Sequence, residues 1–230
     1  MKTINQRVLN LEKIESMPYI SSALAHEIRN PMTAVKGFLQ LITSSDFNEE
    51  KKKEYALIAI SEIDRAESIL RDFLTCSKPH FNNLKNIDLC EEITKVLSTL
   101  QPLANLSMVQ MFFSSYTDQF IQGEGSLVQR FLINLCKNAI EAMEKGGILS
   151  IRTWDDNEYL YMEIKDTGAG MSEEELLQLG KPFFTTKGEK GTGLGLMLTF
   201  SIVKNMEGVI EVTSELGIGT TFLLTFPVQK

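Results

Sequence analysis

Residues 166–171 read DTGAGM and follow the strand-like stretch EYLYMEIK at positions 158–165. A strand that ends in an aspartate followed by Gly-x-Gly turns sharply and leaves the Asp166 carboxylate at the mouth of a pocket. Such a carboxylate can accept a hydrogen bond from an exocyclic amine such as that of adenine. An ordinary Asx turn explains the same residues equally well, so this stretch needs support from elsewhere in the chain.

Upstream, residues 134–142 read NLCKNAIEA inside a helix expected over residues 125–145. Asn134 and Asn138 are four residues apart and therefore lie on one helical face. The Asn138 amide oxygen is a suitable ligand for a hydrated Mg²⁺ that also binds phosphates. In isolation, two asparagines on a helix are more often solvated or capping, so this pattern alone is weak.

Downstream, residues 181–196 read KPFFTTKGEKGTGLGL, and a helix is expected from about Gly193 to Met206. Backbone amides of alternating glycines can approach phosphates closely, and a helix N-terminus favours negative charge. Thr192 is a candidate N-cap, and two preceding lysines favour a phosphate contact. The glycines and lysines concerned are Gly191, Gly193, Gly195, Lys187 and Lys190.

The sequence from Ile87 onward alternates helix-like and strand-like segments. Besides the segments above, a helix is expected at 88–104 and strands at 107–115, 119–124, 148–154, 208–215 and 220–227. Strands that meet in hairpins, with helices between them, predict an α/β sandwich with a mostly antiparallel sheet.

Together and in this order, the three stretches resemble the N, G1, F and G2 boxes of the GHKL ATP-binding fold. Sensor histidine kinases, Hsp90-type chaperones and type II topoisomerases share this fold. The stretch GIGTTFLLTFP at 217–227 is similar to the terminal family element near the adenine pocket. The resemblance covers residues 87–228 and implies that the chain binds ATP and Mg²⁺, with Asn138 as the metal ligand. The nucleotide contacts that it implies are Asn134, Lys137, Asn138, Asp166, Gly168, Gly170, Lys187, Gly191, Thr192, Gly193, Leu194, Gly195 and Thr220.

Three parts of the boxes depart from the family pattern. Glu141 and Ala142 stand where many N boxes carry a basic residue and an aromatic, so Lys137 becomes the candidate for a phosphate-contacting cation. Leu179 stands where the F box usually begins with phenylalanine. This leaves Phe183 and Phe184 to pin the lid, the glycine-containing loop within residues 181–196 that can close over a nucleotide. Thr167 replaces a common asparagine, and the backbone turn tolerates it. None of these changes removes a residue that the chemistry requires.

Residues 17–77 have the pattern of two long helices joined by a short break at SSDFN. Apolar residues in both segments recur at alternating spacings of three and four, which is typical of a bundle seam. Two such hairpins would cover each other's apolar stripes as a four-helix dimer. The fold class is thus α+β, an antiparallel helical hairpin forming a dimeric four-helix bundle, followed by a GHKL-type α/β sandwich. The expected divisions are a helical connector at 1–16, the dimerisation hairpin at 17–77, a linker at 78–86 and the ATP-binding domain at 87–230.

Within the first helix, AHEIRNP at 25–31 resembles the H box of sensor histidine kinases, with His26 in the position of the phosphoacceptor. On general grounds, most surface histidines are simply solvated. His26 lies two residues from both Leu24 and Ile28, so it is expected to point away from the seam. The ATP-binding resemblance downstream outweighs the general expectation, because chaperone and topoisomerase relatives lack this hairpin.

The resemblance assigns a chemical role to the residues around this histidine. Imidazole has an unperturbed pKa of about 6.5, so much of it is neutral and nucleophilic near neutral pH. Glu27 can accept the proton of one ring nitrogen while the other nitrogen attacks the γ-phosphorus of ATP. In the family, the phosphoryl group then passes to an aspartate of a response-regulator receiver domain. Asn30 matches the position that orients a water to dephosphorylate that aspartate, and Pro31 is expected to loosen the helix as a bend or a static kink.

The sequence therefore predicts a two-component sensor histidine kinase that forms a homodimer. The texture of the H-box helix is similar to that of sporulation-type kinases of bacilli, which implies a sporulation phosphorelay and small inhibitor proteins at the base of the hairpin. The alternative is a nucleotide-binding signalling scaffold or adaptor that transfers no phosphate. The presence of His26, Asn138, Asp166 and the lid glycines disfavours that alternative.

Composition limits the other classes of function. The chain has 230 residues, a formal net charge of −7 and 43% apolar residues, which argues against binding to nucleic acid or anionic membranes. Three scattered cysteines suit a reducing cytoplasm and form no disulfide framework or zinc motif. The other histidine, His80, reads as a linker residue. No apolar run approaches ~18 residues, so a cytoplasmic location is expected, and an upstream sensor or membrane anchor stays open.

Overall fold

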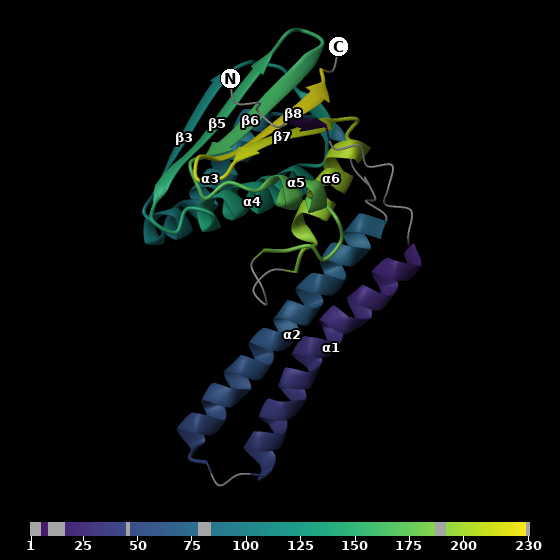
Figure 1. The fold of residues 1–230 in the computed structure, drawn as a ribbon, viewed down its shortest axis with the longest axis vertical. Coiled ribbons are helices and arrows are strands. Elements are labelled where there is room, and N and C mark those ends of the chain that lie inside the picture. The colour runs from purple at the N-terminus through teal and green to yellow at the C-terminus, as the bar shows by residue number, and fades with distance from the viewer. Residues whose placement is uncertain (1–5, 9–16, 45–46, 78–83, 187–191, 229–230) are drawn as a thin grey trace.

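The computed structural model of the chain describes residues 6–8, 17–44, 47–77, 84–186 and 192–228. It consists of a long helical hairpin and a layered α/β domain, and the hairpin extends away from the domain (Figure 1). This is the fold class that the sequence predicts.

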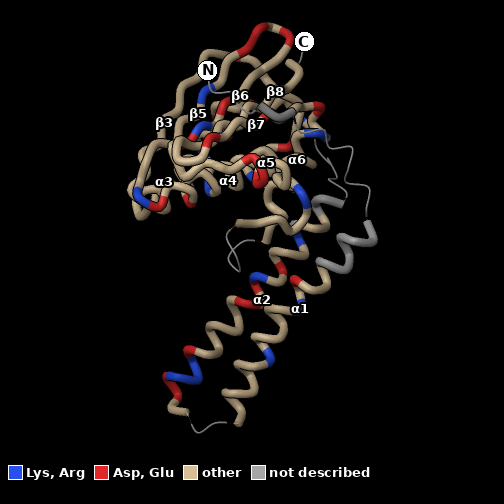
Figure 2. The backbone as a smooth tube through the Cα atoms, viewed as in Figure 1, with Lys and Arg blue, Asp and Glu red and all other residues tan. Residues whose placement is uncertain are grey.

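Helices α1 (Met17–Ser44) and α2 (Glu49–Ser77) form the hairpin, with ends within one or two residues of those expected. Asn48 caps α2, because its side-chain oxygen accepts a hydrogen bond from the Lys51 backbone N–H at 2.9 Å. Three lysines, flanked by glutamates on both sides, occupy the first turns of α2, and two of them pair with these glutamates (Figure 2).

Apolar side chains join the two helices, yet many others on the hairpin stay exposed. Near the loop, the Tyr55 ring contacts Phe38 and Phe47, with centroid distances of 5.6 and 5.4 Å. The large apolar side chains that remain exposed are Met32, Leu39, Leu41, Leu57, Ile60, Ile63, Leu70 and Leu74. A surface of this extent calls for cover by a second hairpin, and the four-helix dimer stays a prediction. None of the helices that the structure describes combines the length and apolarity required to cross a bilayer.

A six-stranded sheet forms one layer of the α/β domain, in the order β1-β7-β8-β6-β5-β3. Its strands are β1 (Gln6–Val8), β3 (Val109–Tyr116), β5 (Gly147–Asp155), β6 (Tyr159–Asp166), β7 (Val209–Glu215) and β8 (Gly219–Pro227). Neighbouring strands are antiparallel except β3 and β5, which confirms the mostly antiparallel sheet. Two further short strands, β2 (Lys85–Ile87) and β4 (Ile121–Gly123), pair separately.

Helices α3 (Leu89–Leu106), α4 (Gly125–Glu141) and α6 (Gly195–Asn205) cover one face of the sheet (Figure 1). Helix α3 begins where Asp88 caps it, since its Oδ1 accepts a hydrogen bond from Cys90 N at 2.8 Å. Alternate side chains of the long strands point at these helices and are buried. The fully buried core includes Phe131, Leu132, Leu135, Leu149, Leu160, Met162, Ile202, Val212, Leu224 and Phe226.

Three short elements differ from the sequence expectation. Gln6–Val8 pair with β7 as a strand, so the helical connector expected at 1–16 is wrong for the part that the structure describes. Lys85–Ile87 form a strand across the boundary expected between the linker at 78–86 and the ATP-binding domain, because they pair with β4. Helix α5 (Glu173–Gln178) follows the glycine turn and begins with a capping box between Ser172 and Glu175.

The hairpin and the α/β domain meet where α2 lies against α6. Ile69 of α2 is buried together with Leu194 and Met197. The partly buried side chains that pack against these three are Leu24, Ile28, Phe73 and Phe183. We call these seven residues the junction cluster.

Candidate active site

Asp166 is the last residue of β6, and 5% of it is exposed. Its Oδ1 accepts hydrogen bonds from the backbone N–H of Gly168 at 2.8 Å and of Thr220 at 3.2 Å. Burial raises the pKa of the Asp166 carboxyl, and the two hydrogen bonds oppose that rise. Oδ2 makes no hydrogen bond among the described residues. Every fully buried side-chain oxygen in these residues has a partner, so Oδ2 is not fully buried. Oδ2 is therefore accessible to a donor such as an exocyclic amine.

The turn after Asp166 packs on one side against the C-terminal end of α4. The Ala169 N–H donates a hydrogen bond to the Ala142 carbonyl at 3.0 Å. A Cβ atom on Gly168 would lie 2.7 Å from the same carbonyl, so this close approach requires glycine. The first two motif stretches, which are far apart in sequence, therefore lie together in the structure.

On its other side, the same turn packs against the hairpin between β7 and β8. Gly170 has φ +66°, and a side chain there would overlap the Glu215 carbonyl. The Gly217 N–H donates a hydrogen bond to the Ala169 carbonyl at 2.7 Å. These backbone contacts hold Asp166 from both sides. We call residues 166–171 and 214–220 together the pocket floor.

The polar residues expected on α4 have three different surroundings. The Asn134 Nδ2 donates a hydrogen bond to the Thr199 Oγ1 at 2.8 Å, which ties α4 to α6. Asn138 is half-buried and lies on the same helical face. Lys137 is exposed, and its Nζ lies 3.8 Å from Glu141 Oε1. The structure thus gives Asn134 a protein partner and leaves the phosphate role of Lys137 a prediction.

A magnesium ion fits this site in a specific way. Among the residues that the structure describes, no group of three or more His, Cys, Asp or Glu side chains could hold a metal. Mg²⁺ bound with substrate phosphates keeps several waters and needs few protein ligands. The amide oxygen of the half-buried Asn138 matches this chemistry, and its role as the metal ligand stays a prediction.

The turn before α6 packs closely against the backbone of the residues that follow Leu179. Gly193 has φ +64°, and a side chain there would overlap the backbone of Phe183, which itself has φ +63°. Leu194 is fully buried in the junction cluster. Leu179, which replaces the usual phenylalanine, is buried in the domain core. Phe183 thus packs against the turn before α6, and its role in holding the loop that precedes this turn stays a prediction.

The N-terminus of α6 differs from the expectation. The helix begins at Gly195, with Leu194 as its N-cap and without a side-chain cap. The Thr192 Oγ1 accepts a hydrogen bond from Leu194 N at 3.4 Å, so Thr192 braces the preceding turn. The prediction that it caps the helix is wrong, because the helix starts later than its glycines suggest. Lys187, Lys190 and Gly191 lie outside the described residues.

His26 is exposed on α1, on the side opposite Leu24 and Ile28, as its spacing predicts. Glu27 is half-buried and Asn30 is exposed beside it. Among the described residues, no hydrogen bond or ion pair joins these three polar side chains to the α/β domain. The structure therefore shows the phosphoacceptor candidate and the nucleotide pocket as two separate groups.

Helix α1 continues through Pro31, which is buried. One turn along, the Thr33 hydroxyl donates a hydrogen bond to the Arg29 carbonyl at 2.8 Å. The helix was expected to loosen at Pro31, and the structure shows that it continues through this residue without a break. His80 lies outside the described residues.

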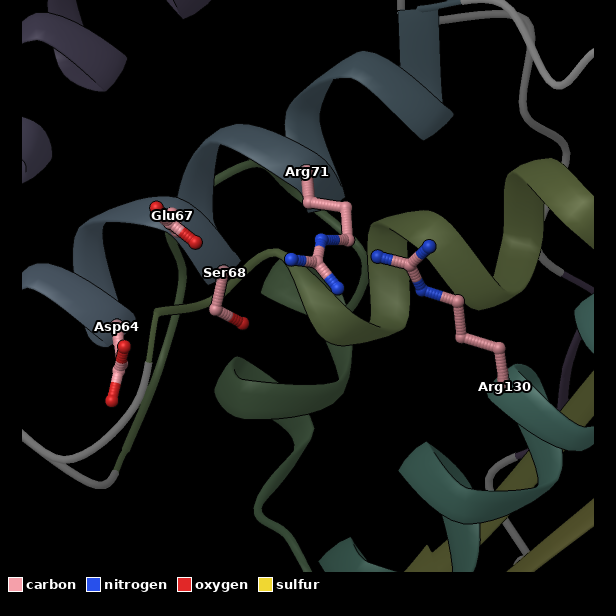
Figure 3. Close-up of a pocket in the computed structure, with 5 residues that line it drawn as sticks. All are labelled: Asp64, Glu67, Ser68, Arg71 and Arg130. Atoms are coloured by element: carbon pink, nitrogen blue, oxygen red, sulfur yellow. The ribbon is translucent and has the colours of Figure 1, made fainter. Parts of the chain in front are cut away.

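A cavity of about 470 Å³ opens between the hairpin and α4. Its lining side chains are polar, namely Asp64, Glu67, Ser68 and Arg71 of α2 and Arg130 of α4. Arg71 and Arg130 extend toward each other from the two parts of the molecule (Figure 3). Neither Asn138 nor Asp166 lines this cavity, so it is separate from the pocket floor.

Two residues that support the pocket were not foreseen from the sequence. The buried Thr199 hydroxyl accepts a hydrogen bond from Asn134 and donates one to the Gly195 carbonyl at 3.0 Å. Ser214, at the end of β7, contacts both halves of the pocket floor. Both lie outside the glycine and asparagine motifs, and a single serine or threonine carries no spacing signal that could have identified them.

Two family models match the chain. Residues 20–80 match the His Kinase A (phospho-acceptor) domain, and residues 123–230 match the histidine kinase-, DNA gyrase B- and HSP90-like ATPase. The chain belongs to the sensor histidine kinases. In this histidine kinase core, the phospho-acceptor match contains His26, and the ATPase match contains Asn138, Asp166 and Thr220.

Curated relatives agree with that family. The histidine kinase core is 40% identical to sporulation kinase A of Bacillus subtilis over 228 residues, which is 98% of this chain and 37% of the relative. Sporulation kinase E of the same organism is 38% identical over 100% of this chain and 31% of its own length. Sporulation kinase C is 36% identical over 99% of this chain and 53% of its own length. The chain thus spans about a third to a half of these relatives.

Solved structures share the fold. A histidine kinase, AdeS of Acinetobacter baumannii, superimposes with a TM-score of 0.74 at 22% identity, over 89% of this chain and 98% of that one. The histidine kinase ThkA in complex with the response regulator protein TrrA superimposes with a TM-score of 0.73 at 25% identity. That match covers 95% of the histidine kinase core and 64% of the ThkA chain.

Proposed function

We propose that the histidine kinase core uses ATP to phosphorylate His26 and then transfers the phosphoryl group to an aspartate of a response-regulator receiver domain. The observation that carries the proposal is an exposed imidazole on a helical hairpin, in one chain with a buried aspartate that backbone groups from two sides hold in place. The sporulation kinases among its relatives make a sporulation-type phosphorelay the expected setting.

ATP is the substrate that the pocket fits. The accessible Oδ2 of Asp166 would accept a hydrogen bond from the adenine amine, and Thr220 would lie beside the base. Asn138 would hold Mg²⁺, which neutralises charge on the phosphates. The backbone around Gly193 and the start of α6 would lie near the phosphates, where N–H groups stabilise negative charge.

The transfer step follows from the chemistry of an exposed imidazole. One ring nitrogen of neutral His26 forms a bond to the γ-phosphorus while the bond from that phosphorus to the ADP oxygen breaks. Glu27 accepts the proton from the other ring nitrogen. The product is a phosphoramidate, which is a good phosphoryl donor. Asn30, which is exposed one turn away, would orient a water that attacks the phosphoryl group on the receiver's aspartate and releases it as inorganic phosphate.

The partners follow from the hairpin. We assign residues 17–77 to dimerisation and phosphoryl acceptance, because their exposed apolar side chains need the cover that a second hairpin supplies. Residues 87–230 bind the nucleotide. A receiver domain would dock against the hairpin near His26, and the ThkA complex with a response regulator supports this kind of partner. Small inhibitor proteins of sporulation pathways would bind nearer the base of the hairpin.

The test is incubation with Mg²⁺ and radiolabelled ATP. We expect one labelled residue whose bond is labile in acid and stable in base, as a phosphoramidate is. His26→Gln should abolish labelling and leave ATP affinity nearly unchanged, because the pocket and the histidine share no hydrogen bond in the structure. Labelling that survives this substitution would contradict the proposal. Phosphotransfer to a panel of receiver domains would then identify the partner.

A further inference from the structure

Ser214 occupies a branching point in the pocket floor. It is the residue before the last of β7, and its side chain is on the same face of the sheet as Val212. Its Oγ accepts a hydrogen bond from the Met171 N–H at 2.8 Å. The same hydroxyl donates to the Gly219 carbonyl at 3.0 Å and lies 2.9 Å from Thr220 Oγ1. One hydroxyl therefore contacts both the turn after Asp166 and the start of β8.

The hydrogen count gives these contacts a definite order. Serine has one O–H donor and two acceptor lone pairs. If that donor serves the Gly219 carbonyl, the two lone pairs receive the Met171 N–H and the Thr220 O–H. Every group is then satisfied once, and the Thr220 hydroxyl is held in one orientation. Alanine at this position would leave two donors and one acceptor without their partner.

The residues that Ser214 holds are the ones that hold Asp166. The Thr220 N–H donates to Asp166 Oδ1, and a Cβ atom on Gly219 would overlap the Asp166 carbonyl. Gly219 has φ +135°, a backbone conformation that residues with a side chain rarely adopt. Contacts with neighbouring residues therefore help to hold it in place. Ser214 is thus one contact away from the carboxylate that faces the pocket.

The fold does not need this hydroxyl in the same way. Strands β7 and β8 are already joined by a ladder that runs from Val209 opposite Thr225 to Glu215 opposite Gly219. Fully buried side chains such as Val212 and Leu224 pack the two strands against the core. Removing one half-buried hydroxyl at the end of the ladder should therefore shift the loops more than it weakens the domain.

We propose that Ser214 is a positioning residue for nucleotide recognition. It fixes the spacing between the turn after Asp166 and the start of β8, so that the Asp166 carboxylate and the Thr220 hydroxyl face an adenine base together. The proposal rests on the proposed function, since it assumes that this pocket takes ATP. It assigns specificity for the base to a side chain that does not touch the base.

The test compares Ser214→Ala, Ser214→Thr and Thr213→Ala in the full chain, with a fluorescent ADP analogue as the probe. Thr213 is the neighbour on the opposite face of the strand, and its side chain makes no hydrogen bond among the residues that the structure describes. Ser214→Ala should bind the probe roughly tenfold more weakly, since the net loss is that of one to two hydrogen bonds. Ser214→Thr should restore affinity, and Thr213→Ala should match the wild-type chain.

A kinetic reading separates positioning from a general structural role. In Ser214→Ala, the KM for ATP in autophosphorylation should rise about as much as the Kd for the probe, while kcat at saturating ATP stays within roughly twofold. Equal affinity in Ser214→Ala and wild type would overturn the inference. So would a loss that Ser214→Thr fails to restore, or a fall in kcat as large as the rise in KM. If the alanine variant does not fold, Ser214→Cys, with its weaker hydrogen bonds, takes its place under the same criteria.

Asp166→Ala keeps this inference distinct from the proposed function. A wild-type chain that binds no probe would remove the nucleotide pocket itself. A wild-type chain that binds, with Asp166→Ala weakened and Ser214→Ala unchanged, would remove the role of Ser214 alone.

Discussion

The pocket floor and the junction cluster are built in opposite ways. In the floor, backbone groups from the turn after β6, the end of α4 and the β7–β8 hairpin bond to one another, and glycines allow approaches that a side chain would block. At the junction, only three of the cluster residues are buried, and a polar cavity of about 470 Å³ opens between α2 and α4. The difference indicates that the pocket floor is rigid before any ligand binds, whereas the contact between hairpin and domain can be remade at little cost.

The position of His26 relative to the junction cluster affects how the reaction can occur. α2 carries the contact to α6, while His26 lies on α1 opposite the residues that pack into the junction cluster. The imidazole therefore points away from the contact that holds its own ATP-binding domain. Transfer to His26 requires this junction to open, or the pocket to come from a second copy of the chain.

Substitutions in the floor should have the largest effect on nucleotide affinity. Asp166→Ala removes the acceptor for the base and leaves two backbone N–H groups without a partner. We expect the Kd for ADP to rise by roughly 100-fold, which corresponds to about 2.7 kcal/mol. Isothermal titration of the variant and the wild-type chain measures this. A change below about threefold would show that the buried carboxylate does not face the ligand.

Alanine substitutions at two glycines, one in the pocket floor and one in the hairpin, should change the free energy of unfolding in opposite directions. Gly170→Ala places a side chain at φ +66° against the Glu215 carbonyl, and it should lower the free energy of unfolding by at least about 1–2 kcal/mol. Gly37→Ala is the matched control, because a Cβ there meets nothing within 4 Å and the residue lies inside α1. It should raise helix stability by about 0.5–1 kcal/mol. Urea unfolding of both variants provides the measurement, and effects of the same sign would contradict the account.

Substitutions in the junction cluster should change the rate of autophosphorylation and leave the affinity for ADP unchanged. Ile69→Ala removes the fully buried side chain of α2 that packs with Leu194 and Met197. Loosening this contact should raise the initial rate of autophosphorylation by roughly threefold or more, because the docked arrangement keeps His26 turned away. The Kd for ADP should stay within about twofold. A lower rate with unchanged affinity would show that the junction promotes transfer.

Acid should weaken nucleotide binding earlier than an ordinary aspartate would. Burial raises the folded-state pKa of Asp166 above 3.8, so the native protein retains that proton to a higher pH than the unfolded chain. The ionised form accepts the donor from the base, so affinity should fall as pH drops through the raised pKa. Between 3.8 and that pKa, the same shift makes the stability of the fold decrease as pH rises. Fluorescence titration from pH 7 downward tests this, and Asp166→Ala should lose the acid limb.

Asn30→Ala should have the smallest effect on the kinase reaction. Asn30 is exposed on the His26 face of α1 and makes no hydrogen bond to the α/β domain among the described residues. We expect autophosphorylation within about twofold of wild type, and slower dephosphorylation of a phosphorylated receiver. A time course of receiver phosphate measures the second effect. A loss of autophosphorylation as large as that of His26→Gln would contradict this division of roles.

The sequence predicted the long elements and the site motifs because their signals are local. Apolar periodicity identified α1 and α2, and an aspartate with Gly-x-Gly after a strand identified the turn that holds Asp166 and Gly170. It failed for Gln6–Val8, whose strand depends on the edge of β7, a partner about 200 residues away in the chain. It also missed Ser214, because its contacts arise from two loops that meet in space and follow no sequence spacing.

Every role proposed here depends on transfer of a phosphoryl group to the exposed imidazole of His26 from ATP bound over the pocket floor. Tandem mass spectrometry of the Mg²⁺-ATP-treated chain, digested and separated at alkaline pH, locates the group directly. We expect one phosphoryl group on the His26 side chain, absent without Mg²⁺ and strongly reduced in Asp166→Ala. A phosphoryl group on any other residue, or on His26 at undiminished level in Asp166→Ala, would contradict it.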